Sequence, residues 1–492
     1  MEIDEVGEGL RERLPGLADE YGVPGVSVAV DAGGRVVEAA AGVLSTATGV
    51  EATVDSVFQI GSVTKVLTAT LVMGLVAEGL VELDAPVDTY LPGFREATVR
   101  QLLCHTAGFE GDVFTDTGKG DDCLERYVEL LAEVPQIFEP GAMFSYNNAA
   151  YSVLGRIVEV VRGEPFDRCM RDHLFTPLGM THAASDPYEA ILHRAAVGHL
   201  GGRPVRVWAM ARSNAPAGSM LAMTARDLLA FARAHLADEG LRAMREPQVV
   251  LPDIGWGTAW GLSWELYDLP GGRGFGHDGN TVGQSAVLRV DPGRDVCVAI
   301  LTNGGDRRPL MREILGRVVE PPAEPVPDPA ARLDARRYAG FYLSSTSRTR
   351  VSADDGGRLW LEHVPLGLAA AAGDEPYRTE LLGWRGDSLL PAKPGHRPVA
   401  FLGDDGGGRA RYLHTGRADS ARPGEPEPDP GPDGGLGMPP SPPRGAATPG
   451  PDPGRVSAAA SADPAGRAGG RSRRRNWGCA PGRAVADCRD RR

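Results

Sequence analysis

Lysine is scarce in this chain of 492 residues. It occurs only at Lys65, Lys119 and Lys393, and arginine supplies nearly all of the remaining positive charge. Because lysine is rare, a lysine at a spacing that suits catalysis stands out from the background. One such lysine ends the sequence Gly-Ser-Val-Thr-Lys at 61–65, directly before an apolar segment that extends to Leu80.

Three further absences limit the class of protein. The net charge of −13 leaves little basic surface, so nucleic acid is not expected as a partner. No run of about eighteen or more apolar residues occurs, so we predict no transmembrane helix and no membrane partner. The first residues are acidic and lack the basic and apolar regions of a secretory signal, so we expect a cytoplasmic protein.

The six cysteines are scattered and form no CxxC pair, so their spacing indicates no metal site. In a reducing compartment we expect them to be free thiols. The cysteines are Cys104, Cys123, Cys169, Cys297, Cys479 and Cys488.

The chain is too long for one ordinary core, and its patterns divide it. Strand patterns occur at both ends of residues 1–320, and helical patterns fill the middle. The economical solution is an α+β domain with one antiparallel sheet built from both ends, flanking helices and an inserted helical lobe. The expected strands are 25–30, 35–40, 261–266, 274–277, 283–290 and 295–302, and the expected helices are 4–21, 62–80, 99–103, 124–134, 149–161, 225–236 and 308–319.

Three segments follow this domain. Residues 321–332 are rich in proline and are expected to form a linker. Residues 333–417 contain short alternating strand patterns, which indicate a small all-β barrel or sandwich. Residues 418–492 consist mainly of Pro, Gly, Ala, Arg and Asp, so this tail is expected to be disordered.

The residues at 61–65 favour nucleophilic chemistry. In a helix that starts near Ser62, residues three apart share a face, so Ser62 and Lys65 would point the same way. A serine hydroxyl needs a base to take its proton, and a lysine can be that base if burial disfavours its charge. The alternative is an ordinary helix N-terminus with Ser62 as its cap.

Two other clusters can contribute to such a site. Tyr146 and Asn148 lie two apart, where a phenol can relay a proton and an amide can hold a lysine. His277 lies in a glycine-rich strand pattern and can donate or accept near neutral pH. Taken alone, each cluster has a simpler interpretation: a packed tyrosine with Asn148 as a helix cap, and a plain turn at 278–279.

Together the three motifs, Ser-x-x-Lys, Tyr-x-Asn and His-x-Gly, resemble the serine β-lactamase and penicillin-binding protein superfamily. The resemblance is strongest to the class C β-lactamase-related branch, which also contains esterases, DD-peptidases and D-amino-acid peptidases. It covers about residues 10–320 and extends to the phrases at 58–65, 102–108 and 176–180. It implies a β-lactamase/transpeptidase-like fold. Residues 333–417 resemble the lipocalin-like domain often appended to this branch.

The resemblance implies a role for each matching residue. Ser62 would be the nucleophile and Lys65 its general base. Tyr146 would carry protons to the leaving group, and Asn148 would orient Lys65 and the substrate amide. The backbone N–H groups of Ser62 and Asn280 would form the oxyanion hole. Chemistry of this type needs no metal, so we expect no cofactor.

The sequence also departs from the family pattern. His277 occupies the position where β-lactamases usually have a lysine that holds the substrate carboxylate, which weakens the case for a dedicated β-lactamase. Gly279, two residues after His277, is expected to bind substrate together with Asn148. Cys104 replaces the usual serine before His105, and we interpret both residues as structural.

Three functions remain open. The first is a cytoplasmic serine hydrolase that acts on an ester or amide, including a peptide, through an acyl-Ser62 intermediate. The second is a penicillin-binding-protein-type thioesterase that takes a nonribosomal peptide from a peptidyl carrier protein and cyclises it. The third is a catalytically silent binding protein on the same fold. In the first case the expected partner is a small-molecule or peptide substrate, without a carrier protein.

Overall fold

The computed structural model describes residues 2–319, 324–371 and 374–422. The predicted disordered tail therefore lies outside the described residues, except for its first five positions. Among the described helices, none combines the length and apolar character needed to cross a membrane. The four described cysteines are buried and unbonded, as expected, and Cys479 and Cys488 lie outside the described part.

One eight-stranded antiparallel sheet forms the centre of the first domain, as predicted. Its order joins strands from both ends of residues 1–320, because β1 pairs with β13 through contacts such as Val28 with Ile300. In sheet order the strands are β2 (Arg35–Gly42), β1 (Gly25–Ala32), β13 (Val296–Thr302), β12 (Ser285–Asp291), β11 (Gly272–Asn280), β10 (Glu265–Leu269), β9 (Ala259–Trp260) and β8 (Val249–Val250).

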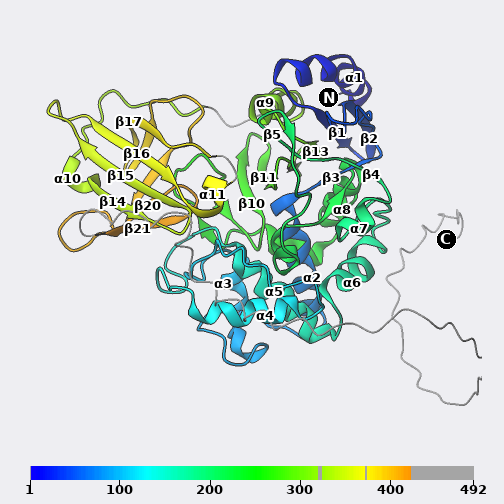
Figure 1. Cartoon of the computed structure of the whole chain (residues 1–492), viewed down its shortest axis with the longest axis horizontal. Helices are drawn as coiled ribbons and strands as arrows, with labels where there is room; N and C mark the ends of the chain where they lie inside the picture. Colours follow the sequence, from blue (N-terminus) through cyan, green and yellow to red (C-terminus); the bar gives the residue numbers. More distant parts are fainter. Residues whose placement is uncertain (1, 320–323, 372–373, 423–492) are drawn as a thin grey trace, which may run out of the picture. The chain divides into compact units, whose positions relative to one another are not determined.

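Helices cover both faces of this sheet. On one face lie α1 (Ile3–Glu20) and α9 (Arg307–Val318) (Figure 1). Their apolar side chains share a core with every second residue of β1, namely Val26, Val28 and Val30. On the other face, α8 (Ala225–Ala237) packs against β1 and β13. Alternation along β1 therefore divides its side chains between two apolar cores.

A helical lobe extends from the second face, below the sheet in Figure 1. Its central helix, α2 (Thr64–Ala77), is apolar nearly all round and is buried on most of its surface. The other helices are α3 (Val99–Leu103), α4 (Cys123–Leu130), α5 (Asn148–Arg162), α6 (Phe166–Met170) and α7 (Pro187–Ala190). Short helical turns are η1 (Gly61–Val63), η2 (Val87–Thr89), η3 (Leu131–Glu133), η4 (Arg171–Phe175), η5 (Arg212–Ala217) and η6 (Glu239–Arg245).

The lobe region also contains short strands that the sequence patterns did not indicate. Most of them have only two residues, too few to produce an alternating pattern. They are β3 (Ser56–Gln59), β4 (Arg194–Ala195), β5 (His199–Leu200), β6 (Arg203–Pro204) and β7 (Ala222–Met223). Strand β3 pairs with β4 and β7 and leads directly into η1.

The second domain is a closed eight-stranded antiparallel barrel, in agreement with the expected lipocalin-like domain. Its strands are β14 (Gly340–Leu343), β15 (Ser347–Ala353), β16 (Leu359–Pro365), β17 (Tyr377–Arg385), β18 (Ser388–Pro391), β19 (Val399–Leu402), β20 (Tyr412–His414) and β21 (Ala418–Arg422). Two short helices, α10 (Ala335–Tyr338) and α11 (Gly367–Ala371), accompany them. The described part of the linker, 324–332, lies outside helices and strands.

The barrel extends beyond the boundary that composition placed at Arg417. Strand β21 starts at the next residue and pairs with both β20 and β14, so it closes the barrel. Its sequence, Ala-Asp-Ser-Ala-Arg, has no aromatic or β-branched residue, which explains why composition assigned it to the tail.

Candidate active site

Ser62 lies in η1, at the junction between β3 and α2. Gly61 has a φ of +52°, and a Cβ built on it would come within 2.5 Å of the backbone nitrogen of Asn280. Only glycine fits both conditions. The backbone of η1 therefore lies directly against the end of β11, and Ser62 is half-buried at the cleft between them.

Lys65 is fully buried one turn later, and its Nζ has three oxygen neighbours. It lies 2.6 Å from Oδ1 of Asn148, 2.6 Å from the carbonyl of Ala217 and 3.2 Å from Oγ of Ser62. Burial holds the pKa of the Lys65 amine well below its usual range, and the positive charge of Arg417 adds to this effect. A neutral amine can donate to the two closer oxygens and keep its lone pair for the Ser62 proton.

Asn148 is free to hold Lys65 because its neighbour caps the helix. Asn147 is the N-cap of α5 and accepts a hydrogen bond from the backbone nitrogen of Ala150. The Nδ2 group of Asn148 donates to Oδ1 of Asp112 at 2.6 Å, which leaves its Oδ1 for Lys65. The alternative interpretation of Asn148 as the cap is therefore wrong.

Tyr146 lies between Lys65 and the aromatic wall of the cleft. Its ring stacks on His105, with 4.3 Å between the ring centroids, and Nζ of Lys65 is 4.9 Å from its centroid. Burial raises the pKa of the Tyr146 phenol above its usual range, and a hydrogen bond with Ser62 acts in the opposite direction. The side chain is therefore a protonated phenol at neutral pH, available as a donor next to Ser62.

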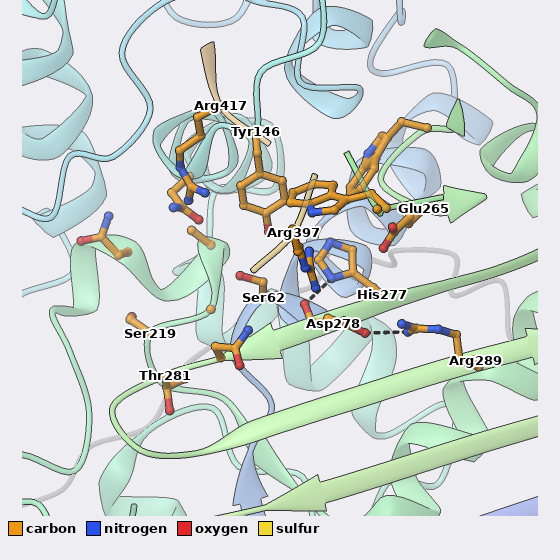
Figure 2. A pocket seen from close by; sticks show the side chains of 18 of the residues that line it. Ser62, Tyr146, Ser219, Glu265, His277, Asp278, Thr281, Arg289, Arg397 and Arg417 are labelled. Carbon is orange, nitrogen blue, oxygen red and sulfur yellow. Dashed lines mark hydrogen bonds and ion pairs between the residues drawn. The ribbon is translucent and has the colours of Figure 1, made fainter. Parts of the chain in front are cut away.

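His277 is on β11 and faces the same cleft (Figure 2). Burial and the charge of Lys65 lower its pKa to about 3, so it is neutral at ordinary pH. Its Nδ1 is 2.7 Å from the carbonyl oxygen of Asp278, which only accepts, so Nδ1 carries the proton. Nε2 is then an acceptor, and it has no hydrogen-bond partner among the described residues. A neutral His277 does not supply the fixed charge that a lysine would.

Gly279 and Asn280 bring the end of β11 against η1. A Cβ on Gly279 would come within 1.8 Å of the carbonyl oxygen of Ile60, so this position also requires glycine. Asn280 accepts a hydrogen bond from Ser285 at 2.8 Å through its side chain. The approach of the two backbones fits an oxyanion hole formed by the N–H groups of Ser62 and Asn280, which remains a prediction.

One cleft with a volume of about 630 Å³ is lined by Ser62, Tyr146, Asn148, His277 and Asn280, whereas Lys65 and Gly279 are not among its lining residues. Figure 2 shows Ser62, Tyr146 and His277 around it, with Arg417 beside Tyr146. Aromatic side chains line the same cleft, namely Phe114, Trp256, Trp260 and Tyr267. The cleft therefore suits a substrate with an apolar or aromatic group next to the scissile bond. Within the described ranges, no cluster of three His, Cys, Asp or Glu side chains could hold a metal ion.

Sequence reasoning missed two residues that support the site, Asp112 and Arg417, and one contact of a third, His105. Asp112 lies in the polar loop after His105 and holds Asn148, but nothing in the loop distinguishes it from its acidic neighbours. His105 has a φ of 59°, and its Nδ1 accepts from the backbone nitrogen of Asn147 at 2.9 Å, so it is structural, as expected, yet it also supports Tyr146. Arg417 comes from the barrel, and no local pattern relates it to the rest.

Comparison with known proteins identifies the family of the chain. The profile of the β-lactamase family matches residues 10–320. The chain belongs to the β-lactamase family. Penicillin-binding protein 4 of Amycolatopsis lactamdurans is 44% identical over 372 residues, which covers 68% of this chain and 96% of that protein. The members of this family that resemble the chain include penicillin-binding proteins, β-lactamases, an esterase and carboxypeptidases.

Solved structures extend the likeness of this β-lactamase-family chain beyond the first domain. The crystal structure of SurE has a TM-score of 0.71 and 30% identity, and covers 85% of this chain and 100% of SurE. SurE with D-Leu gives a TM-score of 0.70. A class C β-lactamase from Rhodobacter sphaeroides, at 22% identity and a TM-score of 0.54, covers 63% of this chain and 99% of its own, and shows the fold alone.

Proposed function

We propose that this chain is a serine acyl hydrolase that cleaves an ester or amide through an acyl-Ser62 intermediate. One observation carries the proposal: the buried Lys65 amine lies 3.2 Å from the Ser62 hydroxyl while two other oxygens take its N–H groups. A lysine held in this way is a base, because burial disfavours its protonated form. A silent binding protein would have no need to bury an amine of lowered pKa beside a serine.

The reaction follows from this arrangement. Lys65 takes the proton as Oγ of Ser62 attacks the substrate carbonyl, and the backbone N–H groups of Ser62 and Asn280 stabilise the oxyanion. The Tyr146 phenol protonates the leaving group and is restored from Lys65. Water then attacks the acyl carbon as Lys65 takes its proton, and the same proton is returned to Oγ of Ser62 as the acid leaves.

A second candidate is a thioesterase that releases and cyclises a peptide from a carrier protein in the cytoplasm. The closed barrel favours it, because the thioesterases that the sequence resembles often carry such a lipocalin-like domain. The crystal structure of SurE with D-Leu supports a D-amino acid next to the scissile bond as the substrate in this case. In this reaction an amine of the same peptide replaces water, and the acceptor Nε2 of His277 can hold that amine.

A small fluorophosphonate probe tests the acyl-enzyme. We expect it to add mass to a peptide that contains Ser62. Ser62→Ala should abolish this labelling and reduce esterase turnover by several orders of magnitude. Ser45→Ala, which changes a buried serine outside the cleft, is the matched control. Labelling of Cys104 with Ser62 unmodified would contradict the proposal. Burial raises the pKa of that thiol, so we do not expect it to react.

A peptidyl thioester with a C-terminal D-residue distinguishes the two candidates. A hydrolase should give the linear acid, whereas a cyclase should give a product lighter by one water. The same peptide with a C-terminal L-residue is the control for stereochemistry. Linear acid from both peptides at equal rates would contradict the cyclase and the preference for a D-residue.

A further inference from the structure

The turn between β20 and β21 of the barrel lies against the segment that carries Tyr146. Three hydrogen bonds join this turn to three successive residues of the hydrolase domain. They are His414 Nε2 to the carbonyl of Phe144 at 2.8 Å, the backbone nitrogen of Tyr146 to the carbonyl of Gly416 at 2.9 Å, and the backbone nitrogen of Ala418 to Oγ of Ser145 at 3.1 Å. The barrel therefore supports the backbone of a site residue.

Arg417 in the same turn enters the cleft. Its guanidinium group lies 5.2 Å from the ring centroid of Tyr146. It forms an ion pair with Asp112, in which Nη2 donates to Oδ1 at 3.0 Å. The Asp112 side chain is only 3% exposed. Because a buried carboxylate without a cation is costly, Arg417 is what permits Asp112 to stay at this place.

Asp112 connects this ion pair to the catalytic base. Its Oδ1 accepts from both Arg417 and the Asn148 amide, and the other end of that amide accepts from Lys65. The side-chain amide of an asparagine can flip by 180°, and a flipped Asn148 would present Nδ2 to Lys65 in place of Oδ1. The Asp112 carboxylate excludes that orientation, since it accepts a hydrogen bond only from Nδ2.

We propose that Arg417 is a positioning residue of the active site, which fixes Asp112 and thereby the Asn148 amide that holds Lys65. The C-terminal barrel is then a component of the catalytic site. This inference rests on the proposed acyl chemistry at Ser62.

The charges of the ion pair give a specific signature. Arg417 lowers the pKa of Lys65 and Asp112 raises it. Removing Arg417 alone leaves the carboxylate unopposed, so the pKa of Lys65 should rise and the acid limb of the pH–rate profile should move to higher pH. Removing both charges cancels the two effects, and the limb should return toward its original position.

The experiment measures the rate of Ser62 labelling by a small neutral fluorophosphonate in the full chain, as a function of pH. We expect Arg417→Ala to reduce this rate by roughly 10²-fold, the cost of a misplaced catalytic group. Arg385→Ala is the matched control. It removes an exposed ion pair between barrel and hydrolase domain, with Asp253 at 3.4 Å, and neither partner lines the cleft.

A double substitution completes the test. Asp112→Asn with Arg417→Ala retains an acceptor for the Asn148 amide but needs no cation, so most of the rate and the original pH limb should return. If Arg417→Ala keeps the rate and pH limb of the unmodified chain, the inference is wrong. It is also wrong if the double variant is no faster than Arg417→Ala, or if Arg385→Ala loses as much.

Two controls keep the result interpretable. Failure of the unmodified chain to label at Ser62 would overturn the proposed function itself, independently of Arg417. If Arg417→Ala does not fold, Arg417→Lys is measured with its melting temperature. Lysine keeps the charge but not the two-pronged contact, so it should fold and label more slowly. Equal labelling by a folded Arg417→Lys would count against the inference.

Discussion

The base and its surroundings come from very different distances in the sequence. Ser62 and Lys65 are three residues apart and share one helical turn. The groups that hold Lys65 are 83 and 152 residues away, and the Arg417–Asp112 pair joins positions 305 residues apart. A local motif therefore supplies the proposed nucleophile and base, whereas the tertiary fold supplies the burial and the hydrogen bonds around Lys65.

The largest effect is expected from replacing Lys65, which belongs to the local motif. Lys65→Arg should reduce kcat/KM for a slow ester by about 10⁴-fold or more, because arginine stays protonated and cannot accept the Ser62 proton. Lys393→Arg, at an exposed lysine of the barrel, is the same substitution without consequence and is the control. Retention of most of the activity in Lys65→Arg would make Lys65 a fixed cation and pass the role of base to Tyr146.

Tyr146→Phe tests the next contribution. Loss of the phenol should reduce kcat by about 10²- to 10⁴-fold with little change in KM, since the ring and its stacking on His105 remain. Steady-state kinetics with the same ester give both values. Tyr188→Phe, at a tyrosine that is 71% exposed, serves as the control. A change confined to KM would show that Tyr146 binds substrate and moves no proton.

The pH dependence of kcat/KM in the unmodified chain tests how burial affects Lys65. Only neutral Lys65 accepts the proton, so kcat/KM should fall as pH falls through the lowered pKa of Lys65. His277, with a pKa lowered to about 3, should add no step near pH 6.5, the usual range for histidine. His277→Gln should therefore leave the limb in place. A limb that disappears in this variant would assign the titration to His277.

The smallest effects concern the end of the chain. A chain that ends after Arg422 should keep its melting temperature and activity, because residues 423–492 have little apolar content. A chain that ends after Arg417 lacks β21, which pairs with β14 and β20, and should melt at a lower temperature. Equal melting temperatures for the two truncated chains would mean that β21 adds nothing to the barrel.

The elements with long periodic patterns could be predicted, and the short ones could not. Three parts of the fold follow from alternation or helical spacing over seven or more residues. They are the hairpin of β1 and β2, helix α2, and strands β12 and β13. The two-residue strands β4 to β7 depend on neighbours distant in the sequence. The closing strand β21 lacks strand-forming side chains and exists because the barrel offers it two partners.

The candidate site shows the same division. The five candidate residues could be found because their motifs occur in a recognisable order. The structure places Ser62, Tyr146, Asn148 and His277 on the lining of one cleft. Lys65 is buried behind the lining, in contact with Ser62 and Asn148. The protonation states could not be read from the motifs. They depend on burial, which lowers the pKa of Lys65 well below its usual range, leaves His277 neutral and leaves Tyr146 protonated.

The position of Arg417 has a consequence for the order of events during synthesis. The ribosome completes Ser62 and Lys65 early, and Arg417 follows only after the whole hydrolase domain and most of the barrel. At about 5–20 residues per second, the interval is on the order of twenty to seventy seconds. Throughout that time the nascent chain contains the nucleophile and the base but not the ion pair that fixes Asn148. Translation itself therefore delays completion of the site until the turn that carries Arg417 has been synthesised.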